Sequence, residues 1–525
     1  MNRQKTFNTY RQIYPTFVYD SYQYDVRPDG LHITFSFRVE DRTGKHPVAF
    51  APTAFVPKRP FLSFNQEAAT LDALVFHIGM AELVSYWKCF CPPTVEVRCG
   101  TLDAQQIAFW KKLYYYGLGE FFYTNGITVS EAEFMTIRTI GQSDIRTSGQ
   151  SDIRTIGQSD IRTIGYSDIR TIGQSDIRTS GQADVRTIGQ SDIRTIGCSD
   201  NPSHPTIRPI QKSSFLVPIG GGKDSVVSLE LLRSSGADIR PLILNPRGAT
   251  TNCAAAAGFG VDDTLVIQRT LDPTMLQLNS QGALNGHTPF SALLAFYSLL
   301  AAQLSGIPSI ALSNENSANE STVAGTAVNH QYSKSVEFER DFRNYVDAYL
   351  VGYNYFSLLR PLCELQIALL FARTERYFDI FRSCNVGSKQ DIWCGHCAKC
   401  LFAFIILSPF IEPQRLAAIF GRNLLSDSSM LPLLQELAGC TDAKPFECVG
   451  TVQEVRAALS LTRHRWYRSA PLPPLLDTDI PLPAPSEAAA LLATFAPDHF
   501  LSDKLTNTLT AALTTATQNF LKNLE

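Results

Sequence analysis

One stretch of the sequence decides the fold: SFLVPIGGGKDSVVSLELL, residues 214–232. It begins with an apolar run typical of a buried strand, continues through three glycines and ends in an amphipathic helical pattern. Glycines let backbone N–H groups approach a phosphate because no Cβ atom intervenes, and the first turn of the next helix directs free N–H groups at the same anion. The stretch therefore predicts a phosphate cradle, with a ligand-free glycine turn as the alternative. The residues predicted to form this cradle are Gly220, Gly221, Gly222 and Ser225.

Strand and helix patterns alternate from this stretch onward. Strand patterns lie at residues 215–219, 240–244 and 309–313, and helical patterns lie at 225–234 and 291–304. This alternation is typical of a parallel sheet covered by helices, so residues 201–462 are predicted to form an α/β domain. Residues 463–525 begin as a proline-rich linker and end in a helical tail at 488–524.

The first 136 residues are predicted to form an α+β N-terminal domain. Strand patterns at 17–26 and 31–39 flank the turn-forming sequence RPDG, residues 27–30, which closes a hairpin. Helical patterns follow at 71–87 and 102–116, with a short strand pattern at 94–97 between them.

An octapeptide, IRTIGQSD, repeats eight times over residues 137–200 with small substitutions. A period of 8 drifts away from the helical period of about 3.6, and each octad carries a glycine, so no apolar helical face persists. A β-solenoid would place isoleucine, threonine and glycine positions on one face, and that face is thinly apolar. We expect an inserted, disordered repeat, with a short solenoid or a binding array as alternatives.

Composition narrows the classes of partner. In 525 residues, 46 Lys and Arg oppose 49 Asp and Glu, and the resulting net charge of −3 indicates no nucleic-acid or anionic-membrane surface. No apolar segment follows the basic N-terminus, so no secretory signal is expected. The longest apolar runs, residues 290–302 and 401–411, are shorter than the about 18 residues that a bilayer span needs. We expect a soluble cytoplasmic protein, and the sequence does not indicate its oligomeric state.

Two polar segments follow the predicted strand at 309–313, and open α/β sheets bind ligands at the carboxyl ends of such strands. They are SNENSAN, residues 313–319, and NHQYSKS, residues 329–335, both dense in donors, acceptors and titratable groups. The alternative for any one of these residues is a helix cap with a solvated polar face. The amides predicted to bind substrate are Asn314, Asn316, Asn319 and Gln331.

Four of the twelve cysteines crowd into one segment: Cys384, Cys394, Cys397 and Cys400. Thiolates two residues apart can turn onto one tetrahedral Zn²⁺, and four cysteines close its coordination shell. The spacing therefore predicts a possible structural zinc rather than a catalytic one. Buried free cysteines before the apolar helix at 401–407 are the alternative.

Five motifs together resemble a known family. They are PIGGGKDS (218–225), SNENSAN, NHQYSKS, CGHCAKC (394–400) and KPFECVGT (444–451). The first is similar to the SGGxDS loop of the PP-loop ATP pyrophosphatases, with Gly220 in place of the usual serine. The set resembles the ATP-dependent UDP-N-acetylmuramoyl-L-alanyl-L-glutamate epimerases of bacterial peptidoglycan synthesis. The resemblance covers residues 215–461 and, less distinctly, GLGEFFYTN at 117–125.

The resemblance implies a fold, a reaction and its cofactors. It implies a parallel-sheet PP-loop domain in which Gly221, Gly222, Asp224 and Ser225 hold the pyrophosphate end of ATP with its Mg²⁺. It also implies that the terminal L-glutamate of a nucleotide-sugar dipeptide is converted to D-glutamate through an acyl-adenylate, with release of AMP and pyrophosphate.

The chemistry explains why such an epimerase needs ATP. A carboxylate makes the neighbouring Cα–H bond weakly acidic, and adenylation removes that charge, so an enolate can form and be protonated on its other face. Lys334 or Lys223 could supply positive charge near the enolate oxygen. The candidate proton carriers, chosen by residue type and clustering, are His330, Tyr332 and Glu315.

Two other functions remain open. A PP-loop followed by clustered cysteines is also similar to the 7-cyano-7-deazaguanine synthases, which use ATP and zinc to make a nitrile, although this leaves NHQYSKS and KPFECVGT unexplained. A non-enzymatic alternative treats the octads as an interaction array carried by an ATP-binding module.

Deleting residues 137–200 distinguishes an inert insertion from an interaction array. If the repeat is inert, the shortened chain should keep the epimerase activity that the resemblance implies, measured as formation of D-glutamate, because no catalytic candidate lies in the octads. A folded shortened chain without activity would favour the array.

Overall fold

A computed structural model of the chain describes residues 2–139, 214–468 and 470–524. The octad repeat from residue 140 on, with the linker that follows it, lies outside the described residues. The first three residues of the repeat belong to strand β6 (Thr136–Thr139). A deletion that removes octads and leaves this strand intact therefore begins at residue 140.

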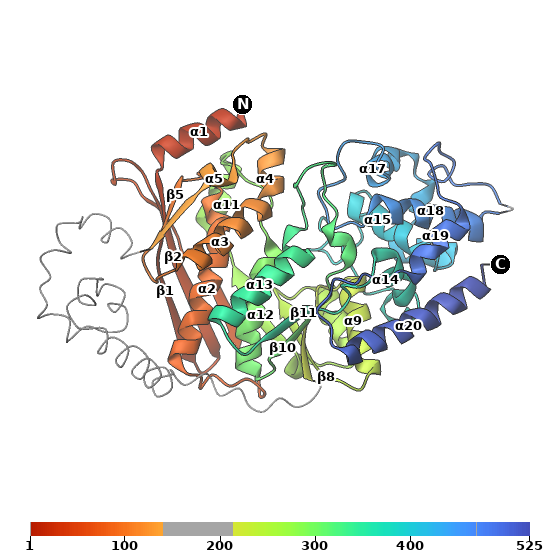
Figure 1. Ribbon diagram of the computed structural model, residues 1–525, viewed down its shortest axis with the longest axis horizontal. Coiled ribbons are helices and arrows are strands. Elements are labelled where there is room, and N and C mark those ends of the chain that lie inside the picture. The colour runs from red at the N-terminus through yellow and green to blue at the C-terminus, as the bar shows by residue number, and fades with distance from the viewer. Residues whose placement is uncertain (1, 140–213, 469, 525) are drawn as a thin grey trace, which may run out of the picture. The chain divides into compact units, whose positions relative to one another are not determined.

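The strands form one mixed sheet (Figure 1). The five strands from β11 to β9 run parallel, β9 pairs antiparallel with β4, and β1 with β2 form the predicted hairpin. The predicted α/β fold class is thus confirmed in this parallel part. The order along the sheet is β11 (Asn354–Ser357), β10 (Ser309–Leu312), β7 (Ser214–Pro218), β8 (Asp238–Leu244), β9 (Leu265–Thr270), β4 (Thr53–Pro57), β2 (Gly30–Glu40), β1 (Thr16–Arg27), β5 (Thr94–Val97) and β6, with β3 (Val48–Phe50) paired to β2.

The parallel strands bury both faces. Successive residues of a strand point to opposite sides, and Leu216 lies in one apolar core while Val217 lies in the other. Helix α12 (Phe290–Ser305) packs on β7, β8 and β10 in the first core, and α9 (Lys223–Ser234) packs on the same strands in the second. Helices on both faces are the arrangement that parallel strands require.

The first core continues into the N-terminal part of the chain. Helix α2 (Ala68–Trp87) packs on β1 and β2 and against α12, so one sheet and one core cross the boundary predicted at residue 136. Among the described residues, α2 is the one helix long and apolar enough to span a membrane, and 72% of its apolar window is buried. The sequence analysis did not include this helix among the longest apolar runs. Its packing is that of a core helix.

The second core is covered by helices from the C-terminal part: α14 (Glu364–Phe371), α15 (Ala398–Leu407), α16 (Pro413–Phe420), α17 (Leu431–Leu437), α18 (Val452–Trp466), α19 (Pro485–Ala490) and α20 (Asp503–Lys522). In Figure 1, α20 lies beside α14 and α9, and the three helices contact one another. The boundary predicted at residue 462 falls inside α18, and α20 buries Leu509, Leu513 and Phe520 in the core.

The other α-helices of the described residues are α1 (Arg3–Ile13), α3 (Ala104–Gly117), α4 (Gly119–Thr124), α5 (Glu131–Phe134), α10 (Gly248–Ala256), α11 (Pro273–Ser280) and α13 (Val336–Tyr349). The predicted strands and helices correspond to β1, β2, β5, β7, β8, β10, α2, α3, α9, α12 and α15, with small shifts at their ends. The helical tail predicted at 488–524 is instead divided between α19 and α20.

A buried ion pair ties α2 to β9. Arg269 donates from Nε to Glu82 Oε1 at 2.5 Å and from Nη2 to Oε2 at 2.7 Å. The side chain of Glu82 is 1% exposed and that of Arg269 is 10% exposed. The Tyr297 hydroxyl of α12 donates to the same carboxylate at 3.1 Å. The pair therefore fixes α2 and α12 against the middle of the sheet.

Replacing Arg269 with methionine should lower the free energy of unfolding by about 3–5 kcal/mol, because Glu82 would remain buried without its cation. Urea unfolding followed by circular dichroism measures the change. The matched control is Arg340→Met, which breaks an ion pair with Asp498 between side chains 47% and 57% exposed. That control should change the value by less than about 1 kcal/mol, and equal losses in the two variants would contradict the prediction.

Candidate active site

The order of the strands reverses at β7. The chain proceeds from β7 to β8 and β9 on one side, whereas β10 and β11 lie on the other side of β7. Ligands of open α/β sheets bind outside the carboxyl ends of the strands at such a reversal, where the two outgoing loops diverge. The outgoing loops here are the glycine loop after β7 and the segment SNENSAN after β10. The fold thus brings the two predicted binding segments to one place.

The glycine loop is shaped by its backbone. Gly221 has a φ of +80°, and a Cβ atom there would lie 2.8 Å from Ala249 Cβ and 2.9 Å from the backbone nitrogen of Thr250. At Gly220, by contrast, a Cβ atom would meet no atom within 4 Å. Gly222 is the N-cap of α9, and its carbonyl accepts from Ser225 Oγ at 3.0 Å. The loop therefore opens at Gly220 onto the N-terminus of α9, where an anion is favoured.

The buried ammonium group of Lys223 pairs with two carboxylates of the protein. It donates to Asp224 Oδ1 at 2.5 Å and also to Glu364 Oε2. Burial opposes the charged form, but the two carboxylates raise the pKa of Lys223 above its usual value. Lys223, predicted as a catalytic cation, thus already neutralises two carboxylates from within the protein.

Three carboxyl groups meet beside the glycine loop: Asp224, Glu315 and Glu364. One oxygen of each lies within 4.8 Å of the others. Burial raises the pKa of Glu315, and burial raises the pKa of Glu364 well above its usual range although Lys223 opposes the shift. Carboxylate oxygens in such a group suit a divalent cation such as Mg²⁺.

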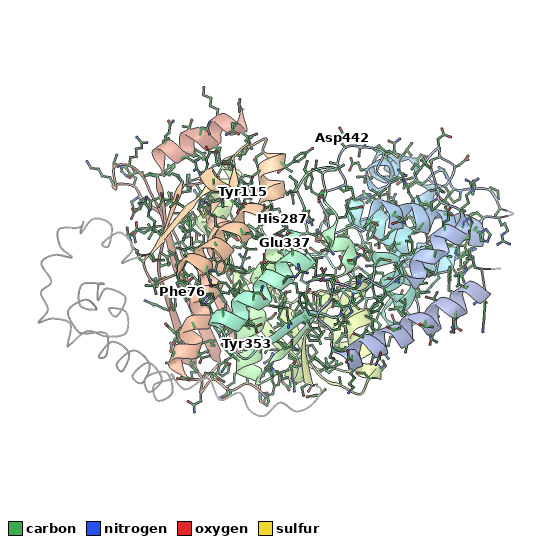
Figure 2. All side chains as sticks on the ribbon, in the orientation of Figure 1. Phe76, Tyr115, His287, Glu337, Tyr353 and Asp442 are labelled. Atoms are coloured by element: carbon green, nitrogen blue, oxygen red, sulfur yellow. The ribbon has the colours of Figure 1, made fainter. Side chains whose placement is uncertain are left out.

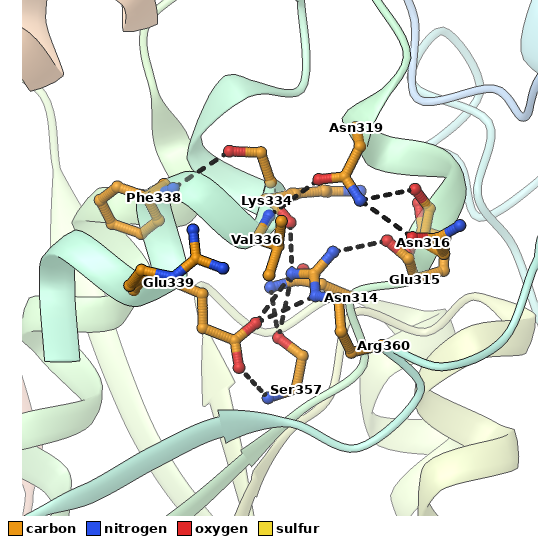
Figure 3. A network of polar contacts seen from close by, with 12 residues as sticks. Asn314, Glu315, Asn316, Asn319, Lys334, Val336, Phe338, Glu339, Ser357 and Arg360 are labelled. Atoms are coloured by element: carbon orange, nitrogen blue, oxygen red, sulfur yellow. Dashed lines mark hydrogen bonds and ion pairs between the residues drawn. The ribbon is translucent and has the colours of Figure 1, made fainter. Parts of the chain in front are cut away.

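A buried arginine holds this side of the site together (Figure 3). Arg360, which has no exposed side-chain surface, pairs with Glu339 Oε2 at 2.9 Å. Its other N–H groups donate to the backbone carbonyls of Glu315, at 2.6 Å, and Lys334, at 2.5 Å. Glu339 Oε1 accepts from the backbone N–H of Ser357 in β11 at 2.8 Å. The backbone of both polar segments is therefore fixed to the sheet.

The four amides predicted to bind substrate make hydrogen bonds within the protein. Asn314 Nδ2 donates to Ser357 Oγ at 3.1 Å, and Asn319 Nδ2 donates to Asn316 Oδ1 at 3.1 Å and to the backbone carbonyl of Asn316 at 2.9 Å. Gln331 Nε2 donates to the backbone carbonyl of Val449 at 3.0 Å. These contacts shape the loops, including the short 3-10 helices Asn316–Asn319 and Tyr332–Lys334.

Lys334 connects the carboxyl groups to a thiol. Its ammonium group donates to Gln331 Oε1 at 3.4 Å and interacts electrostatically with the carboxyl groups of Glu315 and Asp224 and with the thiol of Cys448. Burial opposes the charge of Lys334, whereas these partners raise its pKa above the usual value. Lys334, predicted as a catalytic cation, thus brings an ammonium group to these carboxyl groups.

Cys448 is a half-buried thiol among positive charges. Burial opposes its ionisation, but the charges of Lys334, Lys399 and His330 lower the pKa of the thiol well below its usual range. A thiolate is the form of cysteine that accepts protons and attacks electrophiles.

His330 lies between this thiol and a carboxylate. Its Nδ1 pairs with Glu120 Oε2, and His287 Nδ1 lies 3.6 Å from the same oxygen. The ring of His287, labelled near the centre of Figure 2, packs against that of His330 with a centroid distance of 4.3 Å and an interplanar angle of 47°. Burial opposes the charge of His330, but Cys448 and Glu120 raise its pKa to about 9. Burial lowers the pKa of His287 well below the usual value.

Tyr332 lies apart from this cluster. Its ring packs 5.3 Å from that of Tyr116 on α3. After burial, the causes that raise its pKa are Glu337 and Asp341 of α13. Of the five predicted catalytic residues, the structure therefore gathers Lys223, Glu315, His330 and Lys334 and leaves Tyr332 outside.

The four predicted metal-binding cysteines also meet. The sulfur of Cys397 lies 3.8 Å from that of Cys384 and 3.5 Å from that of Cys400, and the sulfurs of Cys394 and Cys400 are 3.7 Å apart. Tetrahedral zinc with Zn–S bonds of about 2.3 Å separates its sulfurs by about 3.8 Å. Backbone N–H groups of Gly387 and Gly395 donate to two of the sulfurs. The cluster therefore fits a four-thiolate zinc site.

Five side chains of the site were not predicted from the sequence: Glu120, His287, Arg360, Glu364 and Cys448. Glu120 and Cys448 lie in GLGEFFYTN and KPFECVGT, so the family motifs held a signal for them. The other three lie in segments without a motif. Their partners are distant in the chain, as for the Glu364–Lys223 pair, 141 residues apart.

Two family models match the chain. The model of the MurL N-terminal domain matches residues 8–160 and 184–358, and that of the MurL C-terminal domain matches residues 380–485. The first match spans more than half of the chain and includes both the hairpin and the glycine loop.

Relatives with high similarity carry the name UDP-N-acetyl-alpha-D-muramoyl-L-alanyl-L-glutamate epimerase. The protein of that name from Xanthomonas oryzae pv. oryzae is 33% identical over 429 residues, which cover 80% of this chain and 81% of the relative. The one from Salinispora tropica is 40% identical over 287 residues, covering 53% of this chain and 62% of the relative. The one from a Micromonospora species is 40% identical over 279 residues, covering 52% and 62%.

Proposed function

Since the chain belongs to the MurL family, we propose that it epimerises the terminal L-glutamate of UDP-N-acetylmuramoyl-L-alanyl-L-glutamate to D-glutamate, with ATP as co-substrate. The names of the relatives support the substrate and the epimerase class. One observation supports the ATP dependence: the carboxyl groups of Asp224, Glu315 and Glu364 lie together beside the glycine loop, and the Lys334 ammonium interacts with two of them.

The glycine loop is suited to the phosphates. Gly220 leaves open space beside the N-terminus of α9, and the positive φ of Gly221 keeps the backbone close to Ala249. We propose that the loop holds the pyrophosphate part of ATP while the substrate carboxylate attacks the α-phosphorus. That step forms an acyl–oxygen–phosphorus bond and releases pyrophosphate. Asp224, Glu315 and Glu364 would hold Mg²⁺, which neutralises the departing phosphates.

Lys334 is suited to the carbon chemistry that follows. Adenylation removes the carboxylate charge, so the electron pair of the Cα–H bond can move into the acyl group as the proton leaves. The Lys334 ammonium stabilises the enolate oxygen. Arg360 fixes the position of Lys334 by donating to the backbone carbonyl of Lys334. Protonation on the opposite face and attack of water on the adenylate then release the D-glutamyl product and AMP.

The test is pyrophosphate release by the purified chain with ATP, Mg²⁺ and the dipeptide substrate, with the chirality of glutamate measured in the same samples. We expect pyrophosphate that depends on the dipeptide, together with D-glutamate. Asp224→Asn should slow both by about 10²–10³-fold, because the variant loses a proposed Mg²⁺ ligand and with it part of the positive charge that stabilises the transferring group. The control Asp262→Asn changes an exposed carboxylate between α10 and β9 and should have no effect. Pyrophosphate without inversion would contradict the proposed substrate.

We propose that Cys384, Cys394, Cys397 and Cys400 hold a structural Zn²⁺. The zinc would join the segment before α15 to the first turn of that helix, because Cys397 is the helix N-cap and Cys400 lies within α15. Four thiolates leave no open coordination position, so the ion would contribute stability and not chemistry.

Metal analysis of the purified chain should find zinc equimolar with protein. Cys394→Ser should remove the zinc and lower the melting temperature, because three thiolates and a weaker ligand remain. Cys440→Ser, which alters an exposed cysteine, should leave both unchanged. A zinc-free chain whose melting temperature is insensitive to Cys394→Ser would contradict the site.

A further inference from the structure

The proposed epimerase reaction needs a group that removes the proton from Cα, and the residues predicted for this role fit it poorly. Tyr332 lies outside the cluster. His330 is paired with Glu120, and its pKa of about 9 keeps it protonated near neutral pH, so it has no free lone pair to accept a proton. Glu315 lies with the carboxyl groups that face the glycine loop. A different acceptor is required.

Cys448 belongs to a segment that is joined to the segment of Lys334 and His330. The Lys334 ammonium donates to Gln331 Oε1 at 3.4 Å, and Gln331 Nε2 donates to the carbonyl of Val449, the residue after Cys448, at 3.0 Å. Lys334 and His330 both interact electrostatically with the Cys448 thiol. Two cations thus lie close to Cys448, a half-buried residue.

The segment that carries Cys448 is held in place on both sides of the sulfur. The carbonyl of Val449 accepts from Gln331 Nε2 at 3.0 Å, which joins the segment to NHQYSKS. Glu447 Oε2 accepts from Asn385 Nδ2 at 2.6 Å, and the carbonyl of Gly450 accepts from Lys444 Nζ at 3.3 Å. Such support fixes a reacting group to within the tolerance that proton transfer demands.

We propose that Cys448 is a catalytic residue whose thiolate accepts the Cα proton of the adenylated glutamyl residue, an inference that rests on the proposed function. The Cα–H bond breaks, an S–H bond forms, and the electron pair enters the acyl group as an enolate beside Lys334. Water protonates the opposite face of Cα, and the resulting hydroxide takes the proton from the thiol and restores the thiolate. No oxidant or further reactant is needed.

Lys334 and His330 act on the sulfur in this scheme. Their positive charges keep Cys448 ionised, so the base is ready before the substrate is activated. Glu120 holds His330 in its cationic form and the Nδ1 contact fixes its ring. His330 is therefore a positioning residue for the thiolate.

Cys448→Ser tests the proposal by separating the two halves of the reaction. The variant should keep the first burst of pyrophosphate, since adenylation does not use the thiol. It should lose inversion, and exchange of the Cα proton with deuterated water, by about 10²–10⁴-fold, the usual effect of removing a general base. The control is Cys440→Ser, which should retain both. Circular dichroism and zinc content show that each variant is folded.

The outcomes are distinguishable. Inversion by Cys448→Ser at the unaltered rate would overturn the role of Cys448 while leaving the proposed function intact. Loss of the pyrophosphate burst in a folded variant would also overturn it, because the thiol would then act before the Cα step. If the unaltered chain shows neither pyrophosphate release nor inversion, the proposed function fails and the inference fails with it.

Alkylation provides a readout that does not depend on turnover. Iodoacetamide should form a sulfur–carbon bond at Cys448, with release of iodide, faster than at the exposed Cys440, because the thiolate is the nucleophile. His330→Gln should slow this reaction at Cys448 and leave Cys440 unaffected. Slower alkylation of Cys448 than of Cys440 in the unaltered chain would contradict an ionised thiol.

Discussion

The site depends on one buried guanidinium group. Arg360 has no exposed side-chain surface, so its charge must be compensated within the protein, and Glu339 supplies the counter-charge. Its remaining N–H groups bind the carbonyls of Glu315 and Lys334, which belong to different loops. The two loops therefore cannot move apart without leaving a buried donor unsatisfied, at a cost of about 1–3 kcal/mol for each lost hydrogen bond. This constraint keeps the carboxyl group of one loop facing the ammonium group of the other.

Charges of alternating sign extend from this constraint through the site. Lys223 lies between Asp224 and Glu364, Lys334 lies between the carboxyl groups and Cys448, and His330 lies between Cys448 and Glu120. Each buried ion is stabilised by its neighbours, and none would be stable alone in a medium of low dielectric constant. The chain of charges connects the region near the glycine loop with the region near the thiol, although these come from distant parts of the sequence.

Local sequence patterns predicted the elements of the sheet and the two loops at its reversal, because strand and helix periodicities are local properties. Glu315, His330 and Lys334 could be predicted since they lie in dense polar segments after β10. Arg360 and Glu364 could not, because neither belongs to a motif and each acts on residues in other segments. The domain boundary predicted at residue 136 also depended on local sequence alone. A linker is visible in a sequence, but the pairing of β4 with β9, which joins the two parts into one sheet, is not.

The charge of the site also orders the two proposed chemical steps. A free substrate carboxylate beside the Cys448 thiolate would place two negative charges together, and at 4 Å their repulsion is about 4 kcal/mol for an effective dielectric constant near 20. Transfer of the α-phosphorus to that carboxylate removes the charge from the acyl oxygen and makes the Cα proton more acidic at the same time. Proton removal thus becomes favourable only after adenylation. A thiolate held by Lys334 and His330 can therefore remain ionised until it accepts the Cα proton, and the order of the steps needs no movement of the protein to enforce it.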